Sequence, residues 1–236
     1  MRQLGLADTH QYAAHLESHA GEWDALAALC TVSISRFYRD RNVFDCLGAR
    51  VLPELASAAL ARGAPRLECW SAGCASGEEA YTLAIQWHTA LGARFPALGF
   101  QMLGTDIDAA LLARAHAGCY KPSSLKELPA EWREQAFEKR AALFCLRQAL
   151  RGGVEFERQD LLAGLPQQAF DLVLCRNLAF TYFGRDLARH ALDRIASRLR
   201  PGGALVIGIH EHLPSEAGGF AAWPGCRAVF RLERRA

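Results

Sequence analysis

Short apolar runs of strand length alternate along this chain with stretches whose apolar residues recur at helical spacing. This alternation is typical of an α/β fold built on a mostly parallel sheet. The predicted strands are Arg66 to Ser71, Phe100 to Asp108, Leu143 to Leu150, Val154 to Glu157, Phe170 to Cys175 and Ala204 to Ile209, with Arg227 to Leu232 in an antiparallel edge pair. The helices predicted among them are Thr82 to Leu91, Ala109 to Ala117, Pro129 to Arg140 and Arg185 to Leu199.

The residues before Gly63 are expected to form a short helical segment, residues 1–62, ahead of a Rossmann-like domain at residues 63–236. Polar residues and prolines mark the starts of its helices. The expected helices are one capped by Asp8 or Thr9 that runs to His19, one at Glu22 to Cys30, one at Arg41 to Val51 capped by Asp40, and one from Pro53 to about Arg62.

The turn between the first strand of this domain and its helix carries the clearest functional signal. Its glycines, Gly73 and Gly77, let the backbone approach a ligand, and the following helix N-terminus is electropositive. The turn has neither GxGxxG nor GK[ST], so it is not a phosphate cradle. Glu78 and Glu79 would repel a phosphate but would suit an ammonium or sulfonium group, as in S-adenosylmethionine (SAM). Alternatively, both glutamates only complement the helix dipole.

Polar residues at the ends of two further strands are candidates for the same crevice. Asp106 ends the second strand, where a Rossmann-like site accepts from ribose hydroxyls, and Asp108 suits the cap of the next helix. The alternative is that both aspartates only cap. Arg176 and Asn177 follow the strand Phe170 to Cys175 and are expected to face the crevice as well.

Composition narrows the class of protein. A net charge of +2 is too balanced to indicate nucleic acid, and no apolar run reaches the ~18 residues that a membrane helix needs. The N-terminus lacks a signal-peptide core, so a cytoplasmic protein is expected. None of the eight cysteines forms CxxC, and they are interpreted as buried thiols in a reducing compartment. His210 and His212 have no third ligand nearby, so no metal site is predicted.

Several blocks of the chain resemble, in order, motifs of the bacterial chemoreceptor protein-glutamate O-methyltransferases, the CheR family. Trp70 to Tyr81 is similar to its Trp-Ser-Ala-Gly-Cys-Ser-Thr-Gly-Glu-Glu-Pro-Tyr motif. The ordered set covers the chain from about Glu22 to the C-terminus and is much more specific than a single glycine turn. The other blocks are Ser33 to Arg39, Gly104 to Asp108, Ala117 to Tyr120, Val154 to Phe156 with Asp160 to Leu162, and Cys175 to Asn177 ahead of Tyr182-Phe183.

The resemblance implies a seven-stranded methyltransferase sheet that binds SAM and releases S-adenosylhomocysteine. By position, Glu79 would face the amino acid part of SAM, Asp106 the ribose, and Asp160 and Leu161 the adenine. Asp160 stands where the family has Asn, and a carboxylate can also accept from the adenine amino group. Arg39 and Tyr182 would face the methyl-transfer region as catalytic residues. The remaining cofactor-binding candidates are Ser33, Ser35, Arg39, Ala72, Gly73, Cys175, Arg176 and Asn177.

The function implied is methylation of a glutamate side chain on a chemoreceptor-like protein by a monomer. Four departures from the family pattern bear on that substrate. Only the end of the family's helical N-terminal domain is recognisable, and the stretch from Phe137 to Val154 is short for its small β-subdomain. Tyr182 lies one residue further from Asn177 than usual, which leaves Phe180 or Thr181 as alternatives for its position, and Gly208 to Glu211 stands where the family has Gly-His-Ser-Glu. The alternatives are a small-molecule methyltransferase for a carboxylate, thiol or amine, and a non-catalytic SAM-binding regulator.

Overall fold

The computed structural model describes residues 4–6, 8–19, 21–22, 26, 35–214 and 218–233. The chain divides into two compact units, residues 1–34 and 35–236. In the first unit, helix α1 (Thr9–Ser18) begins as predicted at Asp8, whose carboxylate accepts from the amide of Gln11 at 2.8 Å. The predicted helix at Glu22 to Cys30 lies largely outside the described residues.

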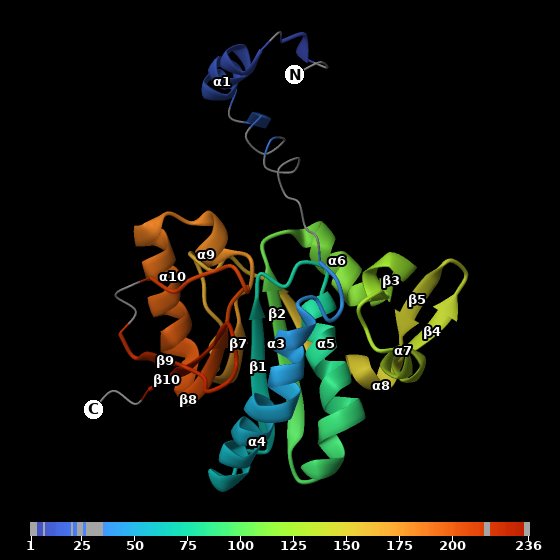
Figure 1. The fold of residues 1–236 in the computed structure, drawn as a ribbon. Coiled ribbons are helices and arrows are strands. Elements are labelled where there is room, and N and C mark those ends of the chain that lie inside the picture. Colours follow the sequence, from blue (N-terminus) through green and yellow to red (C-terminus); the bar gives the residue numbers. More distant parts are fainter. Residues whose placement is uncertain are drawn as a thin grey trace. The chain divides into compact units, whose positions relative to one another are not determined.

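The second unit contains a seven-stranded sheet with the order β6-β2-β1-β7-β8-β10-β9 (Figure 1). Strands β6, β2, β1, β7 and β8 pair in parallel, while β10 is antiparallel to both β8 and β9. The Rossmann-like, seven-stranded fold and its antiparallel edge are therefore confirmed. The strands are β1 (Arg66–Ala72), β2 (Gly99–Asp106), β6 (Val154–Arg158), β7 (Phe170–Leu174), β8 (Leu199–Val206), β9 (Phe220–Ala222) and β10 (Val229–Leu232).

Helices cover both faces of this sheet (Figure 1). On β1, Leu67 and Cys69 belong to one core, and Trp70 and Ala72 belong to the other, because successive strand side chains point to opposite faces. Helix α10 (Arg185–Arg198) packs in the second core, together with α9 (Ala179–Tyr182). The helices of the first core are α3 (Arg41–Cys46), the π-helical turn η2 (Leu47–Val51), α4 (Leu52–Ala61), α5 (Glu78–Gln86), the π-helical turn η3 (Trp87–Leu91) and α6 (Ala109–Ala117); a short 3-10 turn, η4 (Gly92–Arg94), follows η3.

A small antiparallel sheet, β3-β5-β4, follows α6, and two predictions in this region are wrong. The helix expected through Arg140 ends at Ala136, because the Phe137 ring packs edge-on against Phe37 at 5.2 Å and the chain continues as a strand. The strand expected through Leu150 ends at Leu146, and a short helix follows. The elements here are β3 (Cys119–Tyr120), η5 (Pro122–Leu125), α7 (Ala130–Ala136), β4 (Phe137–Arg140), β5 (Leu143–Leu146) and α8 (Gln148–Arg151).

Four cysteines form disulfides, which corrects the prediction that all the cysteines are thiols. Cys119 and Cys145 face each other across β3 and β5, and Cys46 joins α3 to Cys226 between β9 and β10. The partners are 26 and 180 residues apart in the chain, so their proximity follows from the tertiary fold. The described cysteines that remain as thiols, Cys69, Cys74 and Cys175, are buried as expected.

Candidate active site

The carboxyl ends of four adjacent strands form one edge of the main sheet. Ala72 of β1 lies opposite Thr105 of β2, and Asp106 of β2 lies opposite Arg158 of β6. On the other side of β1, Ser71 lies opposite Leu174 of β7. Ligands of open α/β sheets bind outside such carboxyl ends. The fold therefore brings the predicted residues that end or follow these strands to one edge: Ala72, Gly73, Asp106, Asp160, Leu161, Cys175, Arg176 and Asn177.

The turn after β1 folds back over the end of β2. The amides of Gly73 and Cys74 both donate to the carbonyl of Thr105, at 2.8 and 2.9 Å. Gly73 has φ +77°, and a Cβ placed on it would overlap Cδ2 of Leu178. Only glycine fits here without displacing Leu178. The backbone of this turn therefore lies against the Leu178 side chain more closely than any residue with a Cβ would allow.

The two aspartates after β2 have different partners. Asp108 caps α6, since its Oδ1 accepts from the amides of Ala110 at 2.8 Å and Leu111 at 3.1 Å, which confirms that part of the prediction. The carboxylate of Asp106 accepts from the amide of Ala75 at 2.8 Å through one oxygen and from that of Asp108 at 3.0 Å through the other. Each oxygen retains further acceptor capacity. Asp106 is therefore held in place and can still accept from ribose hydroxyls.

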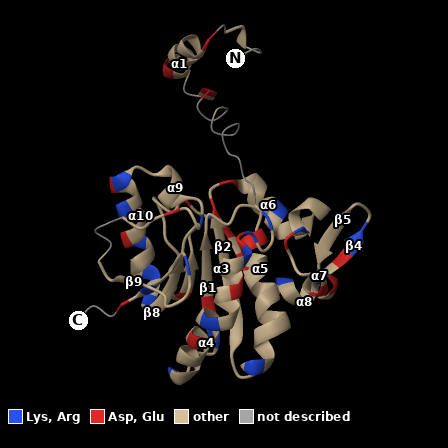
Figure 2. Cartoon of the chain, in the orientation of Figure 1, with Lys and Arg blue, Asp and Glu red and all other residues tan. Residues whose placement is uncertain are grey.

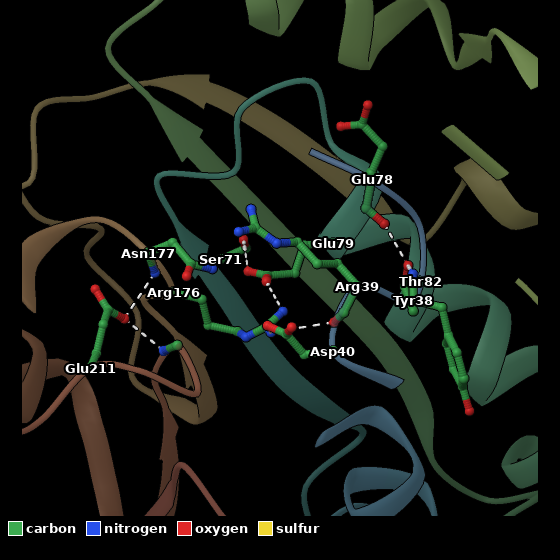
Figure 3. Close-up of polar contacts among 11 residues, drawn as sticks. Tyr38, Arg39, Asp40, Ser71, Glu78, Glu79, Thr82, Arg176, Asn177 and Glu211 are labelled. Atoms are coloured by element: carbon green, nitrogen blue, oxygen red, sulfur yellow. Dashed lines mark hydrogen bonds and ion pairs between the residues drawn. The ribbon is translucent and has the colours of Figure 1, made fainter. Parts of the chain in front are cut away.

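Arg176 ties together three segments that are remote in sequence (Figure 3). Its Nη1 donates to Oε1 of Glu79 at 2.7 Å, and its Nη2 donates to Oδ2 of Asp40 at 2.6 Å and to the carbonyl of Arg39 at 3.3 Å. The Arg176 side chain is only 2% exposed, with its guanidinium 5.2 Å from the ring centre of Phe44. The ion-pair network of Asp40, Glu79 and Arg176 therefore connects the end of β7 with the start of α5 and the segment before α3.

Asp40 departs from its predicted role. It occupies the N-cap position of α3 with φ +61°, but its carboxylate makes no cap hydrogen bond and pairs with Arg176. The pair with Arg176 joins two ionised groups, whereas a cap bond would join the carboxylate to a neutral amide, and a buried guanidinium needs a counter-charge. Asp40 and Arg176 are 136 residues apart, so no local pattern reveals the pairing.

The two glutamates at the start of α5 have separate environments. Glu79 keeps 16% of its side chain exposed and accepts from the hydroxyl of Ser71 at 3.2 Å in addition to Arg176. Glu78 is 1% exposed, and its two oxygens accept from the hydroxyl of Ser76 at 3.0 and 2.9 Å. This separation agrees with the prediction that Glu79, and not Glu78, is the one available to a ligand.

The segment from Ser35 to Arg39 is anchored next to α5. The amide of Tyr38 donates to the hydroxyl of Thr82 at 3.1 Å, and the amide of Phe37 donates to the carbonyl of Ser124 at 3.0 Å. Figure 3 shows the Arg39 side chain pointing toward the same group of residues as Glu79 and Arg176. Ser33, the other polar candidate of this motif, is not among the residues that the structure describes.

Asp160 and Leu161 follow β6 and are held by backbone contacts. Oδ1 of Asp160 accepts from the amide of Leu162 at 2.8 Å. The Leu161 side chain is buried, and its carbonyl accepts from Nε of Arg194 at 2.7 Å. The turn after β6 thus places one carboxylate and one apolar side chain together, which is the pair expected for an adenine.

The Cys175 thiol is expected to resist iodoacetamide in the folded protein, because burial raises its pKa to about 12. A raised pKa keeps the thiol protonated at every pH below that value, and the neutral thiol is a poor nucleophile. Peptide mapping by mass spectrometry after labelling at pH 8 should find Cys175 modified only when the protein is unfolded first. Equal labelling of native and unfolded protein would contradict this protonation state.

The helix α9 carries the three residues considered for the catalytic aromatic position. Tyr182 is 70% exposed, Phe180 is partly buried against the core, and the Thr181 hydroxyl donates to Oε1 of Glu211 at 2.6 Å. Among these three, Tyr182 presents the accessible aromatic side chain. Its catalytic role stays a prediction.

Glu211 is a residue to which the sequence pattern assigned no role, although it retains the glutamate of the family's Gly-His-Ser-Glu motif. It is 8% exposed and accepts from Thr181 and from the amides of Asn177, Leu178 and Gly208. The available signal was that shared glutamate, which lies a few residues after β8.

A cavity of about 720 Å³ lies elsewhere, between α10 and the β8–β10 edge, and is lined by residues such as Leu192, Phe220 and Leu232. A second cavity of about 440 Å³ lies beside the small sheet. Neither is lined by a predicted site residue. We therefore place the candidate site at the polar residues that follow the carboxyl ends of the strands, and not in either of these two cavities.

Comparisons with known proteins identify the family of the chain. A family model described as "CheR methyltransferase, SAM binding domain" matches residues 33–228, a range that contains every predicted site residue. A chemotaxis protein methyltransferase of Listeria monocytogenes is 35% identical over 207 residues, which cover 88% of this chain and 76% of that protein. Chemotaxis protein methyltransferase 1 of Pseudomonas aeruginosa is 32% identical over 219 residues (90% and 78%), and a chemotaxis protein methyltransferase of Escherichia coli is 32% identical over 221 residues (90% and 73%).

Proposed function

Since the chain belongs to the CheR methyltransferase family, we propose that it transfers the methyl group of SAM to a glutamate side chain of a chemoreceptor-like protein. The chain is a SAM-dependent methyltransferase, with the seven-stranded sheet expected of one. Its relatives carry the name chemotaxis protein methyltransferase, which supports a receptor as the substrate. The observation that carries the proposal is the convergence of Gly73, Glu79, Asp106 and Arg176 at one sheet edge.

The residues at this edge fit SAM chemically. The partly exposed carboxylate of Glu79 suits the ammonium group, and Asp106 retains acceptor capacity for the ribose hydroxyls. The turn at Gly73 offers backbone without a side chain. We assign Asp160 and Leu161 to the adenine. Further contacts are proposed for Ser33, Ser35, Arg39, Ala72, Cys175, Arg176 and Asn177, and the same residues would hold the product S-adenosylhomocysteine.

The proposed reaction requires alignment more than acid–base chemistry. A glutamate side chain has a pKa near ~4.3 and is already ionised at neutral pH, so its oxygen needs no general base. SAM supplies a methyl group that the positive sulfur already activates. The protein then has to orient the acceptor oxygen in line with the methyl group and the sulfur, which Arg39 and Tyr182 are proposed to do.

Tyr182→Phe is expected to lower kcat by about 10- to 100-fold, because it removes one hydrogen bond to a charged acceptor. The affinity for S-adenosylhomocysteine should change by less than about threefold. Because the side chain is 70% exposed, stability should change by about 0.5 kcal/mol or less. Steady-state kinetics measures kcat, and calorimetric titration measures the affinity for S-adenosylhomocysteine. Full activity in this variant would assign the role to another residue.

Labelling in a host lysate tests the acceptor class directly. The protein is incubated with methyl-labelled SAM and a lysate of its own host, and the labelled species is isolated and treated with mild base. A base-labile label on a large protein is expected for a glutamyl methyl ester. A labelled small molecule would instead indicate a small-molecule methyltransferase, and tight SAM binding with no labelled product would indicate a regulator.

We propose a cytoplasmic, monomeric enzyme with a protein partner, in which the reducing compartment would hold Cys46 with Cys226 and Cys119 with Cys145 as dithiols. None of the helices within the described residues is long and apolar enough to cross a membrane. Charges of both signs alternate along α10, as Figure 2 shows, and the net charge is +2. This mixed surface supports a protein partner in preference to nucleic acid. Sedimentation of the purified protein measures its oligomeric state.

A further inference from the structure

One buried carboxylate receives four hydrogen bonds at the edge of the site. Glu211 lies after β8 and is 8% exposed. Its Oε2 accepts from the amides of Gly208 at 2.6 Å and Asn177 at 2.8 Å. Its Oε1 accepts from the amide of Leu178 at 3.1 Å and from the hydroxyl of Thr181 at 2.6 Å. Three of the four donors belong to the segment that follows β7, so one side chain holds that segment against the end of β8. Figure 3 shows Glu211 beside Asn177, the first of these donors.

The backbone of this segment, residues 177–182, includes a strained conformation that the hydrogen bonds of Glu211 can stabilise; we call these bonds the Glu211 clamp. Asn177 has φ +54°, a left-handed conformation that a non-glycine residue adopts at a cost. The bond from its amide to Glu211 helps to hold it there. Gly208 leaves room for the arrangement, because a Cβ at that position would lie 2.7 Å from Oδ1 of Asn177 and 2.8 Å from Oε2 of Glu211.

The clamped segment faces the cofactor turn on one side and carries the proposed catalytic tyrosine on the other. The Leu178 side chain lies directly over Gly73, where it fills the space that a Cβ would need. The four-residue helix α9 then leads to Tyr182, whose ring is 70% exposed and is not fixed by the core. So short a helix has little stability of its own in water. Its position therefore depends on the packing of Ala179 and Phe180 in the second core and on the contacts of Leu178 and Thr181.

We propose that Glu211 is a positioning residue for methyl transfer. It fixes residues 177–182 so that Leu178 closes over the cofactor turn and Tyr182 is presented to the acceptor. This inference rests on the proposed role of Tyr182. A carboxylate suits the position because it is acceptor-only and both of its oxygens face donors, whereas an amide would direct its NH₂ group at two of them.

The test compares Glu211→Gln with Glu155→Gln, which removes one exposed carboxylate from β6 and serves as the matched control. We expect amide hydrogen exchange at Asn177, Leu178 and Gly208 to accelerate by about 10-fold or more in Glu211→Gln, a loss typical of charge-assisted bonds. The amides of Gly73 and Cys74, which bond to Thr105, should keep their wild-type rates. The control should leave all five amides unchanged.

Kinetics distinguish positioning from a purely structural role. On the acceptor found by lysate labelling, Glu211→Gln should lower kcat by about 10-fold or more, while KM for SAM stays within about threefold. Thr181→Val, which removes one of the four donors, should give a smaller loss in the same direction. Faster exchange with an unchanged kcat would overturn the proposal, and so would an equal loss of SAM affinity and kcat.

The two readouts also separate this inference from the proposed function. The exchange measurement needs no acceptor and can be made with S-adenosylhomocysteine bound. A small-molecule acceptor would refute the proposed substrate and would still allow the kcat comparison. Wild-type exchange rates at the three amides in Glu211→Gln would refute the clamp whatever the acceptor is.

Discussion

Arg176→Met is expected to lower the free energy of unfolding by about 3–5 kcal/mol, the typical cost of removing one partner from a buried ion pair. The guanidinium is 2% exposed and lies between the carboxylates of Glu79 and Asp40 at 2.7 and 2.6 Å. Methionine fills similar space but leaves two carboxylates close together without a cation. Their mutual repulsion and incomplete solvation oppose folding.

Urea unfolding of the purified protein measures this loss. Arg140→Met is the matched control, since its side chain is 70% exposed and pairs with Glu138 at 3.3 Å on the surface, where such pairs contribute about 0–1 kcal/mol. Adding Asp40→Asn to Arg176→Met should recover part of the stability, because it removes one of the uncompensated charges. An Arg176→Met variant as stable as the Arg140→Met control would show that the network does not stabilise the fold.

Glu79→Gln is expected to weaken SAM binding by about 10- to 100-fold. A hydrogen bond to a charged group contributes about 1.5–3 kcal/mol, and each 1.4 kcal/mol is a tenfold change in Kd. The amide retains the size of the side chain and its contact with Ser71, but it cannot offset the charge of an ammonium group. Arg176 keeps its bond to Asp40, so the fold should survive.

Calorimetric titration with SAM and with S-adenosylhomocysteine measures this affinity. Glu78→Gln is the control, because Glu78 is adjacent in sequence yet 1% exposed and bonded to Ser76. Its Kd should stay within about threefold of wild type, while its stability falls. Equal affinity losses in the two variants would mean that Glu79 has no specific contact with the cofactor.

Much of the main sheet could be predicted from the sequence, because β7 is a nearly continuous apolar run, β6 alternates apolar and charged residues, and the helices have clear periodicity. The cap of α6 at Asp108 was also predictable, because an aspartate just before a helical run accepts from the first amides of that helix. The region after α7 was not, since the contact of Phe137 with Phe37 decides that a strand forms there. The disulfide of Cys46 with Cys226, 180 residues apart, likewise depends on the complete fold.

The candidate site shows the same division. Gly73, Asp106 and Arg176 were predictable because each follows an apolar strand, and parallel strands end at one edge. Asp40 was assigned a local cap, whereas in the fold it pairs with Arg176. The contacts of Glu211 could not be recognised, because Asn177, Leu178 and Thr181 precede it by 30 to 34 residues and three of its four donors are backbone amides, which leave no sequence pattern.

The cross-link between Cys46 and Cys226 has a consequence for the unfolded chain. It closes a ring over a separation of 180 residues, which encloses nearly all of the main sheet. The chain-entropy model gives about 5 kcal/mol for a ring of this size, gained by restricting the denatured ensemble. The same sequence would therefore have two different unfolding equilibria, one for the reduced dithiol chain and one for the chain closed into a ring by the disulfide.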